Sequence, residues 1–321
     1  MLPEDPMYAR WAMRYLALTA SLIALTGCAS GAPSSWQRGG DAPEGRTEVA
    51  AAMVSGRIVV AGGFTQDGHA SAHADLYDPT TDRWSRLPDL PLAVHHAMAA
   101  SDGRRMYVAG GYAAGTALTG ASRRVFSIRP GEARWSELPR LPVSRAAGGA
   151  AVVAGRLYVV GGTFGATPRL ARRSFVLDLR TRRWTAFAGV PQAREHLGAA
   201  AVGDRIYLLG GRNAVQRFKR ADAWDVGERR WVGLRDMPTA RGGTSAAARN
   251  GRVVSIGGES SAGTNGEVEE FDPRTGRWRQ LPPLPEGRHG LGVAAIGRRL
   301  YVLLGGPQPG LTVSTSVFRL G

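Results

Sequence analysis

Short apolar runs that end in a pair of glycines recur along the chain. Each run starts with Arg and continues through four or five mostly apolar residues, and the Gly pairs begin at positions 62, 110, 161, 210, 257 and 305. Runs of this length, rich in Val, Ile and Tyr, are typical of β-strands rather than helices. The steps between the pairs are 48, 51, 49, 47 and 48 residues. Such regular spacing predicts a repeat architecture.

Tryptophan marks a second recurring position. One Trp precedes each Gly pair, by 26 residues in the first five repeats and by 27 in the last, at Trp36, Trp84, Trp135, Trp184, Trp231 and Trp278. We interpret the extra residue of the last repeat as a β-bulge within 300–304. Glycines at the end of a strand allow a positive φ and the close approach of a neighbouring segment.

Each repeat divides into four short segments with strand character. In the first repeat these are 49–54, 58–61, a stretch around Leu76-Tyr77 and a stretch that begins at Trp84, with a turn at 78–84. Four short antiparallel strands, repeated six times, predict a β-propeller. The first segments are rich in Ala, as expected for strands that crowd around an axis.

The motifs of the repeat resemble those of the kelch family. The resemblance rests on the Gly pair, an aromatic residue such as Tyr77, the Asp-Pro-Thr-Thr-Asp-Arg-Trp turn at 78–84 and the Leu87-Pro88 tail, and it covers 33–321. It implies an all-β, six-bladed kelch β-propeller with four antiparallel strands per blade. The last repeat ends before a Trp, and Trp36 has no Gly pair before it. We therefore expect the segment around Trp36 to close the ring as the fourth strand of the blade formed by 286–321.

The N-terminal segment predicts export. An apolar run at 15–24 leads to Leu25-Thr26-Gly27-Cys28, which resembles the lipobox of bacterial lipoproteins. We expect a signal peptide at 1–28 with lipidation of Cys28, a tether at 29–35 and the propeller at 36–321. This places the protein in the cell envelope, periplasmic or anchored to the outer membrane, with membrane contact through the lipid only. An ordinary secretory peptide with an incidental Cys is the alternative.

Composition narrows the chemistry. The net charge is +15, carried almost entirely by Arg, but export and the lack of a nucleic-acid-binding motif argue against nucleic acid as a partner. Cys28 is the only Cys, so the propeller has no disulfide and cannot carry the Tyr–Cys copper chemistry of kelch-type galactose oxidases. Neighbouring strand residues point to opposite faces, so His95-His96 does not predict a metal site. We expect no cofactor and no metal.

The candidate binding site is a set of arginines. A Pro-x-x-Arg pattern precedes the first strand of five repeats and contains Arg46, Arg145, Arg194, Arg241 and Arg288. His95 occupies the corresponding connection of the second repeat, and Glu195 follows Arg194. These connections share one end of the propeller with the long, dissimilar loops 64–73, 112–123, 163–172, 212–219, 259–266 and 307–312. Arginines gathered at a central mouth would form an anion site, whereas in the alternative they only brace the loops.

These features predict a binding module for a protein or an anionic glycan or peptide, working as a monomer. The alternative is a carbohydrate-active enzyme similar to sialic-acid epimerases or mutarotases, with Arg194-Glu195-His196 and His289 at the mouth. We interpret Glu195 as a solvated loop carboxylate and assign no catalytic residue. A structural envelope protein without a small-molecule site is the third possibility.

Overall fold

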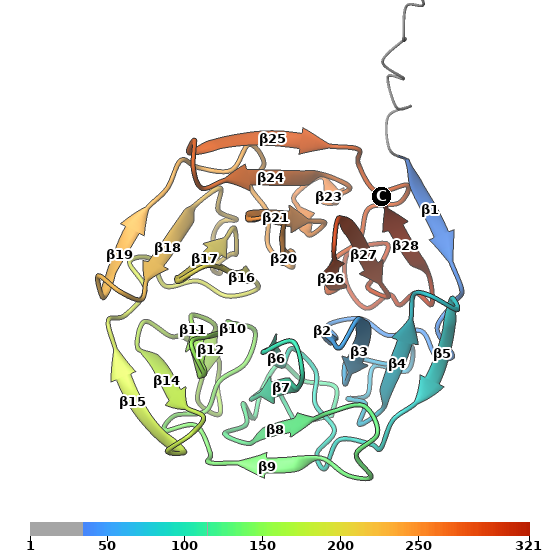
Figure 1. The fold of residues 1–321 in the computed structure, drawn as a ribbon, viewed down its shortest axis with the longest axis horizontal. Helices are drawn as coiled ribbons and strands as arrows, with labels where there is room; N and C mark the ends of the chain where they lie inside the picture. The colour runs from blue at the N-terminus through green and yellow to red at the C-terminus, as the bar shows by residue number, and fades with distance from the viewer. Residues whose placement is uncertain (1–34, 114) are drawn as a thin grey trace, which may run out of the picture. The chain divides into compact units, whose positions relative to one another are not determined.

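Each repeat folds into one antiparallel sheet. A computed structural model describes residues 35–113 and 115–321, and the strands of this part form six four-stranded sheets arranged in a ring (Figure 1). The expected signal peptide, Cys28 and all but the last residue of the tether lie outside the described residues. Within them, no helix is long and apolar enough to cross a membrane. The prediction of a six-bladed propeller is confirmed.

The blades follow one another in chain order. The strands of the first three are β2 (Ala50–Val54), β3 (Arg57–Ala61), β4 (Ala74–Asp78) and β5 (Arg83–Arg86); β6 (Met98–Ser101), β7 (Met106–Ala109), β8 (Val125–Ile128) and β9 (Ser136–Leu138); β10 (Gly149–Val153), β11 (Arg156–Val160), β14 (Ser174–Asp178) and β15 (Arg183–Phe187). The next two comprise β16 (Gly198–Val202), β17 (Arg205–Leu209), β18 (Ala221–Asp225) and β19 (Arg230–Gly233); β20 (Ser245–Arg249), β21 (Arg252–Ile256), β24 (Val268–Asp272) and β25 (Arg277–Leu281).

The sixth blade joins the two ends of the repeat array. It contains β26 (Gly292–Ile296), β27 (Arg299–Leu303), β28 (Val317–Leu320) and, as its outermost strand, β1 (Trp36–Gly39). Trp36 pairs with Leu320 and Gly39 with Val317 in an antiparallel register. The expected closure is confirmed, and it leaves the last blade with the same four strands as the others.

The tryptophans tie each blade to the one before it. The indole Nε1 of Trp231 donates a hydrogen bond to the carbonyl of Ala188, at 3.0 Å, where the previous blade leaves its outer strand. The other five indoles make the equivalent bond, from Trp36 to Pro282, Trp84 to Gly40, Trp135 to Pro88, Trp184 to Pro139 and Trp278 to Arg235. The repeated Trp is therefore a connection between blades as well as an apolar filler.

The glycine pairs let adjacent blades approach through their backbones. The N–H of Gly111 donates to the carbonyl of Arg145 in the next blade, and a Cβ on Gly110 would lie 2.0 Å from the same oxygen. In the last repeat Leu304 takes the first position of the pair with φ +60°, and Gly305 donates to Arg46. The β26–β27 register is continuous from Gly292 to Ile296, so the expected bulge is wrong. Strand β27 keeps the usual five residues. Leu304 and Gly305 take the positions of the Gly pair, so Gly305-Gly306 in the sequence lies one residue later than the pairs of the other repeats.

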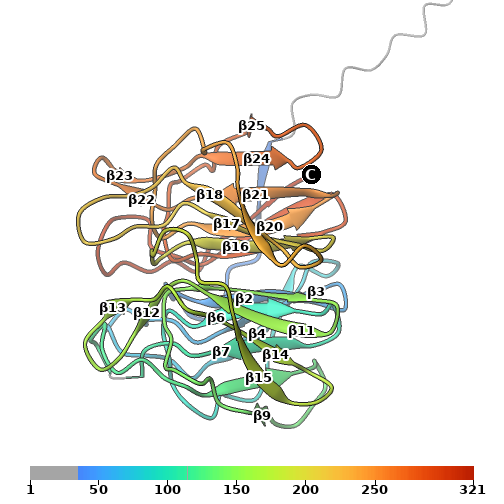
Figure 2. The same cartoon turned by 90° about the vertical axis from the view of Figure 1, so that its left-hand side faces the viewer.

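The two ends of the propeller differ as expected. Tight turns connect the first two strands of each blade at one end, which we call the tight-turn face, and the long loops form the other end, the long-loop face. The loop hairpins β12–β13 (Thr163–Phe164 and Arg169–Leu170) and β22–β23 (Glu259–Ser260 and Gly263–Thr264) lie on the same side of the ring in Figure 2. The innermost strands converge on the axis (Figure 1). Many alanines of these strands line the space between them.

Candidate functional site

The Pro-x-x-Arg arginines do not reach the central mouth. Arg46, Arg145, Arg194, Arg241 and Arg288 have relative exposures of 0 or 1%. A guanidinium without accessible surface cannot contact a ligand, so the expected anion site is wrong for this set. The arginines lie inside the blades, where they brace the loops, which was the alternative interpretation.

A second position in the same blade explains how these charges are buried. The residue nine positions before the blade's own Trp is acidic in three blades, and there it pairs with the arginine: Arg46 with Asp75, Arg194 with Asp222 and Arg241 with Glu269. In two other blades the equivalent residue of the third strand is Phe, and the guanidinium lies over its ring: Arg145 over Phe175 at 5.6 Å and Arg288 over Phe318 at 4.8 Å. Phe318 is identified by its place on β28, because the Trp of its blade, Trp36, lies on β1. The second blade has Val94 in place of Arg and Phe126 at the partner position. Burial lowers the pKa of Arg145, which has no carboxylate partner, to about 10.

The central mouth is formed by the residues two positions after these five arginines and after Val94. They have φ between +51° and +62°, and they are Glu48, His96, Ala147, His196, Gly243 and Gly290. Each of the last five donates its backbone N–H to the carbonyl of the ring residue before it, at 2.7 to 3.1 Å, and Val49 completes the circle by donating to Gly290 at 3.3 Å. The left-handed conformation at each position lets the six connections form a continuous hydrogen-bonded ring around the axis.

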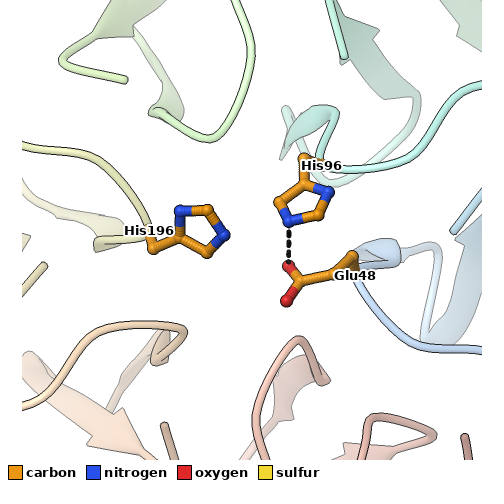
Figure 3. A group of neighbouring side chains, drawn as sticks. All are labelled: Glu48, His96 and His196. Atoms are coloured by element: carbon orange, nitrogen blue, oxygen red, sulfur yellow. Dashed lines mark ion pairs between the residues drawn. The ribbon is translucent and has the colours of Figure 1, made fainter. Parts of the chain in front are cut away.

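Three side chains of this ring point toward one another. Glu48, His96 and His196 come from three different blades and converge at the axis (Figure 3). Nε2 of His96 lies 3.3 Å from Oε2 of Glu48, and one donor atom from each of the three residues lies within 4.8 Å of the others. The side chains of His96 and His196 are only 4% and 3% exposed. Gly290 makes room for Glu48, because a Cβ there would lie 2.7 Å from the carboxyl carbon.

His95 and His96 both belong to the site, contrary to the expectation of opposite faces. They lie in the bend before β6 rather than on a strand, and His96 has φ +56°. Their Nδ1 atoms are 2.6 Å apart, and the His95 ring stacks on Phe64 at 3.7 Å between centroids. Burial lowers the pKa of His95 to about 4 and that of His96 well below its ordinary value. Both rings are therefore neutral near pH 7. One Nδ1 carries a proton and donates it in a hydrogen bond to the Nδ1 of the other ring.

His289 contacts the Glu48 carboxylate oxygen that does not face His96. Its Nδ1 lies 3.2 Å from Oε1 of Glu48, and its Nε2 lies 3.1 Å from the carbonyl of Gln308. Both nitrogens face oxygen acceptors, which favours the imidazolium. Burial opposes that charge, but the hydrogen bond and charge of Glu48 raise the pKa of His289 above its ordinary value. Burial also opposes the charge of Glu48, but the surrounding histidines hold its pKa well below the ordinary value.

Arg212 is the arginine that does lie at the mouth, and it is shared between two acids. It contacts Oε1 of Glu195 at 3.1 Å and Oε1 of Glu259, and its NH2 lies 3.2 Å from Nε2 of His196. Glu195 is not a solvated carboxylate, because its side chain is 18% exposed. Burial acts to raise the pKa of Glu195, but His196 and Arg212 lower it to about 2.

An axial pocket of about 430 Å³ opens at the long-loop face. Its lining includes the apolar residues Phe64, Leu118 and Leu311, the ring residues Glu48, His96 and His196, and Arg212, Glu259 and His289. The lining contains three carboxylates, of Glu48, Asp67 and Glu259, but one arginine. The pocket is therefore not the basic mouth that the net charge predicts.

Sequence reasoning placed His95 and Glu195 at the right end of the propeller but missed the convergence of Glu48, His96 and His196. A signal was available, because each of the three stands two positions after Arg46, Val94 or Arg194, in the connection that leads into the first strand of its blade. Equivalent positions of a closed repeat face the same axis. For Arg46, Arg194 and Arg241, burial within the blade was signalled by the acidic residue nine positions before Trp.

Comparisons with known proteins agree with the geometry of the repeat. The KLHDC2/KLHL20/DRC7 Kelch-repeats domain model matches residues 29–188 and 139–306. Similar proteins include beta-scruin from Limulus polyphemus, at 25% identity over 40% of this chain and 14% of its own length. Kelch-like protein 35 from Mus musculus is 28% identical over 40% of the chain and 21% of its own length, and Kelch-like protein 34 from Homo sapiens is 35% identical over 38% and 19%. The chain thus spans about a fifth or less of these relatives.

Proposed function

This chain belongs to the kelch-repeat family, and from that premise we propose that it is a protein-binding module whose partner docks on the long-loop face. A kelch propeller generally indicates a protein-binding module.

The distribution of exposed apolar side chains carries the proposal. Among the described residues the large hydrophobic side chains that are exposed are Leu118 at 42%, Val215 at 90% and Leu311 at 45%. All three lie on the long loops, and Leu118 and Leu311 line the axial pocket. Apolar groups gathered around a concave site on variable loops are typical of an interaction surface. We therefore propose a partner segment that inserts an apolar side chain between Leu118 and Leu311.

The same pocket argues against an anionic ligand as the first choice. The arginines expected to hold a carboxylate are buried within the blades, and Arg212 is already shared by Glu195 and Glu259. The isomerase alternative needed those free guanidiniums to hold its acidic substrate. Recognition through apolar contacts therefore has the better support.

Peptide selection provides a defined probe for this surface. Peptides selected from a random display library on the full chain are synthesised and titrated by fluorescence anisotropy against wild type, Leu118→Asp, Leu311→Asp and Val215→Asp. Hot-spot contacts of this kind cost about 2 kcal/mol or more, so at least one substitution weakens binding by roughly thirtyfold. Asn250→Asp adds the same charge in an exposed turn of the tight-turn face and leaves affinity unchanged. Equal affinity for wild type and all three loop variants would refute the proposal.

Export and lipid anchoring remain part of the proposed function. They are supported by the apolar run at 15–24 and by the lipobox-like Leu25-Thr26-Gly27-Cys28. Metabolic labelling with an alkyne fatty acid in a bacterial host tests the anchor: the wild-type chain takes up label in the membrane fraction, and Cys28→Ala does not. Label that persists in Cys28→Ala, or is absent from wild type, would contradict the anchor.

A further inference from the structure

We infer that Glu48, His96 and His196 form a binding site for a divalent first-row transition metal ion on the propeller axis. The inference goes beyond protein binding at the long-loop face and does not depend on it. It stands on the convergence of three donor groups, the contacts that orient them, and the charge and access of the surrounding pocket.

The donor geometry is close to that of a metal site. Zinc–nitrogen and zinc–oxygen bonds of about 2.0–2.2 Å place the donors of a tetrahedral site roughly 3.3–3.5 Å apart. Nε2 of His96 and Oε2 of Glu48 already stand 3.3 Å apart. The third donor, on His196, lies within 4.8 Å of both and must approach by at most about 1.5 Å to complete the triangle. The hydrogen-bonded ring fixes the three backbones, so this approach falls to the side chain of His196.

Neighbouring groups orient the ligands as outer-shell partners do in metalloproteins. Nδ1 of His96 contacts Nδ1 of His95, and with the shared proton on His96 its Nε2 carries a lone pair toward the axis. His289 holds the other oxygen of the Glu48 carboxylate. A purely structural polar cluster does not require that His96 and Glu48 each have a separate partner, His95 and His289, on the side away from the axis.

Charge and access also fit a cation. The axial pocket is lined by three carboxylates against one arginine and His289, so negative groups outnumber positive ones even with His289 protonated. Glu48, His96 and His196 border both this pocket and an inner axial space of about 120 Å³, so an ion can enter from the long-loop face. Three protein ligands leave an open position for water or a ligand donor. A mixed imidazole and carboxylate set favours zinc and its transition-metal neighbours over calcium and magnesium, which prefer oxygen ligands.

Arg212 is the competing cation. Its NH2 lies 3.2 Å from Nε2 of His196, the nitrogen that faces the axis in Figure 3, and thus shares the lone pair that a metal would use. Glu195 and Glu259 continue to hold Arg212 when that contact is lost. Removal of the guanidinium is therefore expected to strengthen metal binding.

Titration of the full chain with metal chloride tests the site. The reference is Cys28→Ser, which removes a thiol that binds zinc by itself, and the protein is stripped with chelator before calorimetry with ZnCl2 and absorption spectroscopy with CoCl2. We expect one zinc per chain, a visible cobalt spectrum and no competition by CaCl2. Glu48→Gln, His96→Asn and His196→Asn each weaken zinc binding by at least about a hundredfold, and His289→Gln by about ten- to a hundredfold. Asn is well tolerated at the positive φ of the two histidines.

The matched control is His69→Ala with His73→Ala, which removes the two histidines outside the cluster and leaves affinity unchanged. Arg212→Met tightens binding severalfold. Melting curves without metal identify any variant that fails to fold. The zinc affinities of the ligand variants that do fold then test the site. The site is overturned if stoichiometric zinc binding is absent, if it survives the ligand substitutions, or if it is lost in the control. Weaker binding in Arg212→Met would overturn the assignment of His196 Nε2.

Discussion

The buried pair of Arg241 and Glu269 gives the sharpest stability prediction. Both side chains have 0% exposure, and NH2 of Arg241 lies 2.7 Å from Oε2 of Glu269. Glu269→Gln keeps the shape of the side chain but leaves the guanidinium as an unpaired buried charge. Loss of one partner of such a pair costs about 3–5 kcal/mol. Arg241 keeps its hydrogen bond to the carbonyl of Glu267, which places the expected loss at about 3 kcal/mol.

The chain itself supplies the compensating change. The second blade has Val94 and Phe126 at the positions of Arg241 and Glu269. Replacing a buried ion pair by apolar residues of similar volume is often neutral or stabilising. We therefore expect the double variant Arg241→Val with Glu269→Phe to lie within about 1 kcal/mol of wild type, although each single change at either position is costly.

Urea unfolding followed by circular dichroism and tryptophan fluorescence measures the cycle. Wild type, Glu269→Gln, Glu269→Phe, Arg241→Val and the double variant are compared at equal m-value, so that midpoints report stability alone. An unchanged midpoint for Glu269→Gln would refute the account of the buried charge. A double variant whose loss equals the sum of Arg241→Val and Glu269→Phe would refute the idea that the two positions form one unit.

Three further predictions concern the contacts between blades. Trp231→Phe keeps the ring but removes the bond to Ala188, and a loss of about 0.5–1.5 kcal/mol is expected in urea unfolding; no loss would deny the indole bond a stabilising role. Deletion of 29–42 removes β1 and should lower the melting temperature markedly, whereas unchanged melting would contradict ring closure. Asp82 accepts the N–H of Gly40, and chiefly this bond lowers its pKa. Because a lowered folded pKa stabilises above the unfolded value of about 3.9, the advantage of wild type over Asp82→Asn in thermal melts should persist at neutral pH and shrink below about pH 4; a gap that does not change with pH would refute it.

Much of the architecture was predictable because the same residue types recur at equivalent positions of the six repeats. The spacing of Trp and Gly pairs predicted six blades, and the unmatched Trp36 predicted the closing strand. The expected bulge at 300–304 is wrong because the Gly-Gly pair of the last repeat stands one residue after the positions that have the conserved backbone conformation. The conformation needs a positive φ followed by a close approach, and Leu304 with Gly305 provides both.

The candidate site was predictable only in its location. Pro-x-x-Arg marked the correct connections, but the direction of each side chain was inferred from charge alone. Asp75, Asp222 and Glu269 pair with three of these arginines inside the blades. The residues two positions after the arginines have a left-handed conformation and lie at the axis instead. Side-chain direction depended on a left-handed backbone conformation, which is uncommon for a residue such as Glu48 and was therefore not expected there.

The amino-acid sequence alone determined the number of blades, their internal order and the residues at which they touch, because these follow from local periodicity and recur six times. Tertiary structure decided which of the repeated positions face solvent, core or axis. Glu48, His96 and His196 lie far apart in the chain and acquire a shared chemistry only when the ring closes, since closure brings equivalent positions of separate repeats within a few ångströms of one axis.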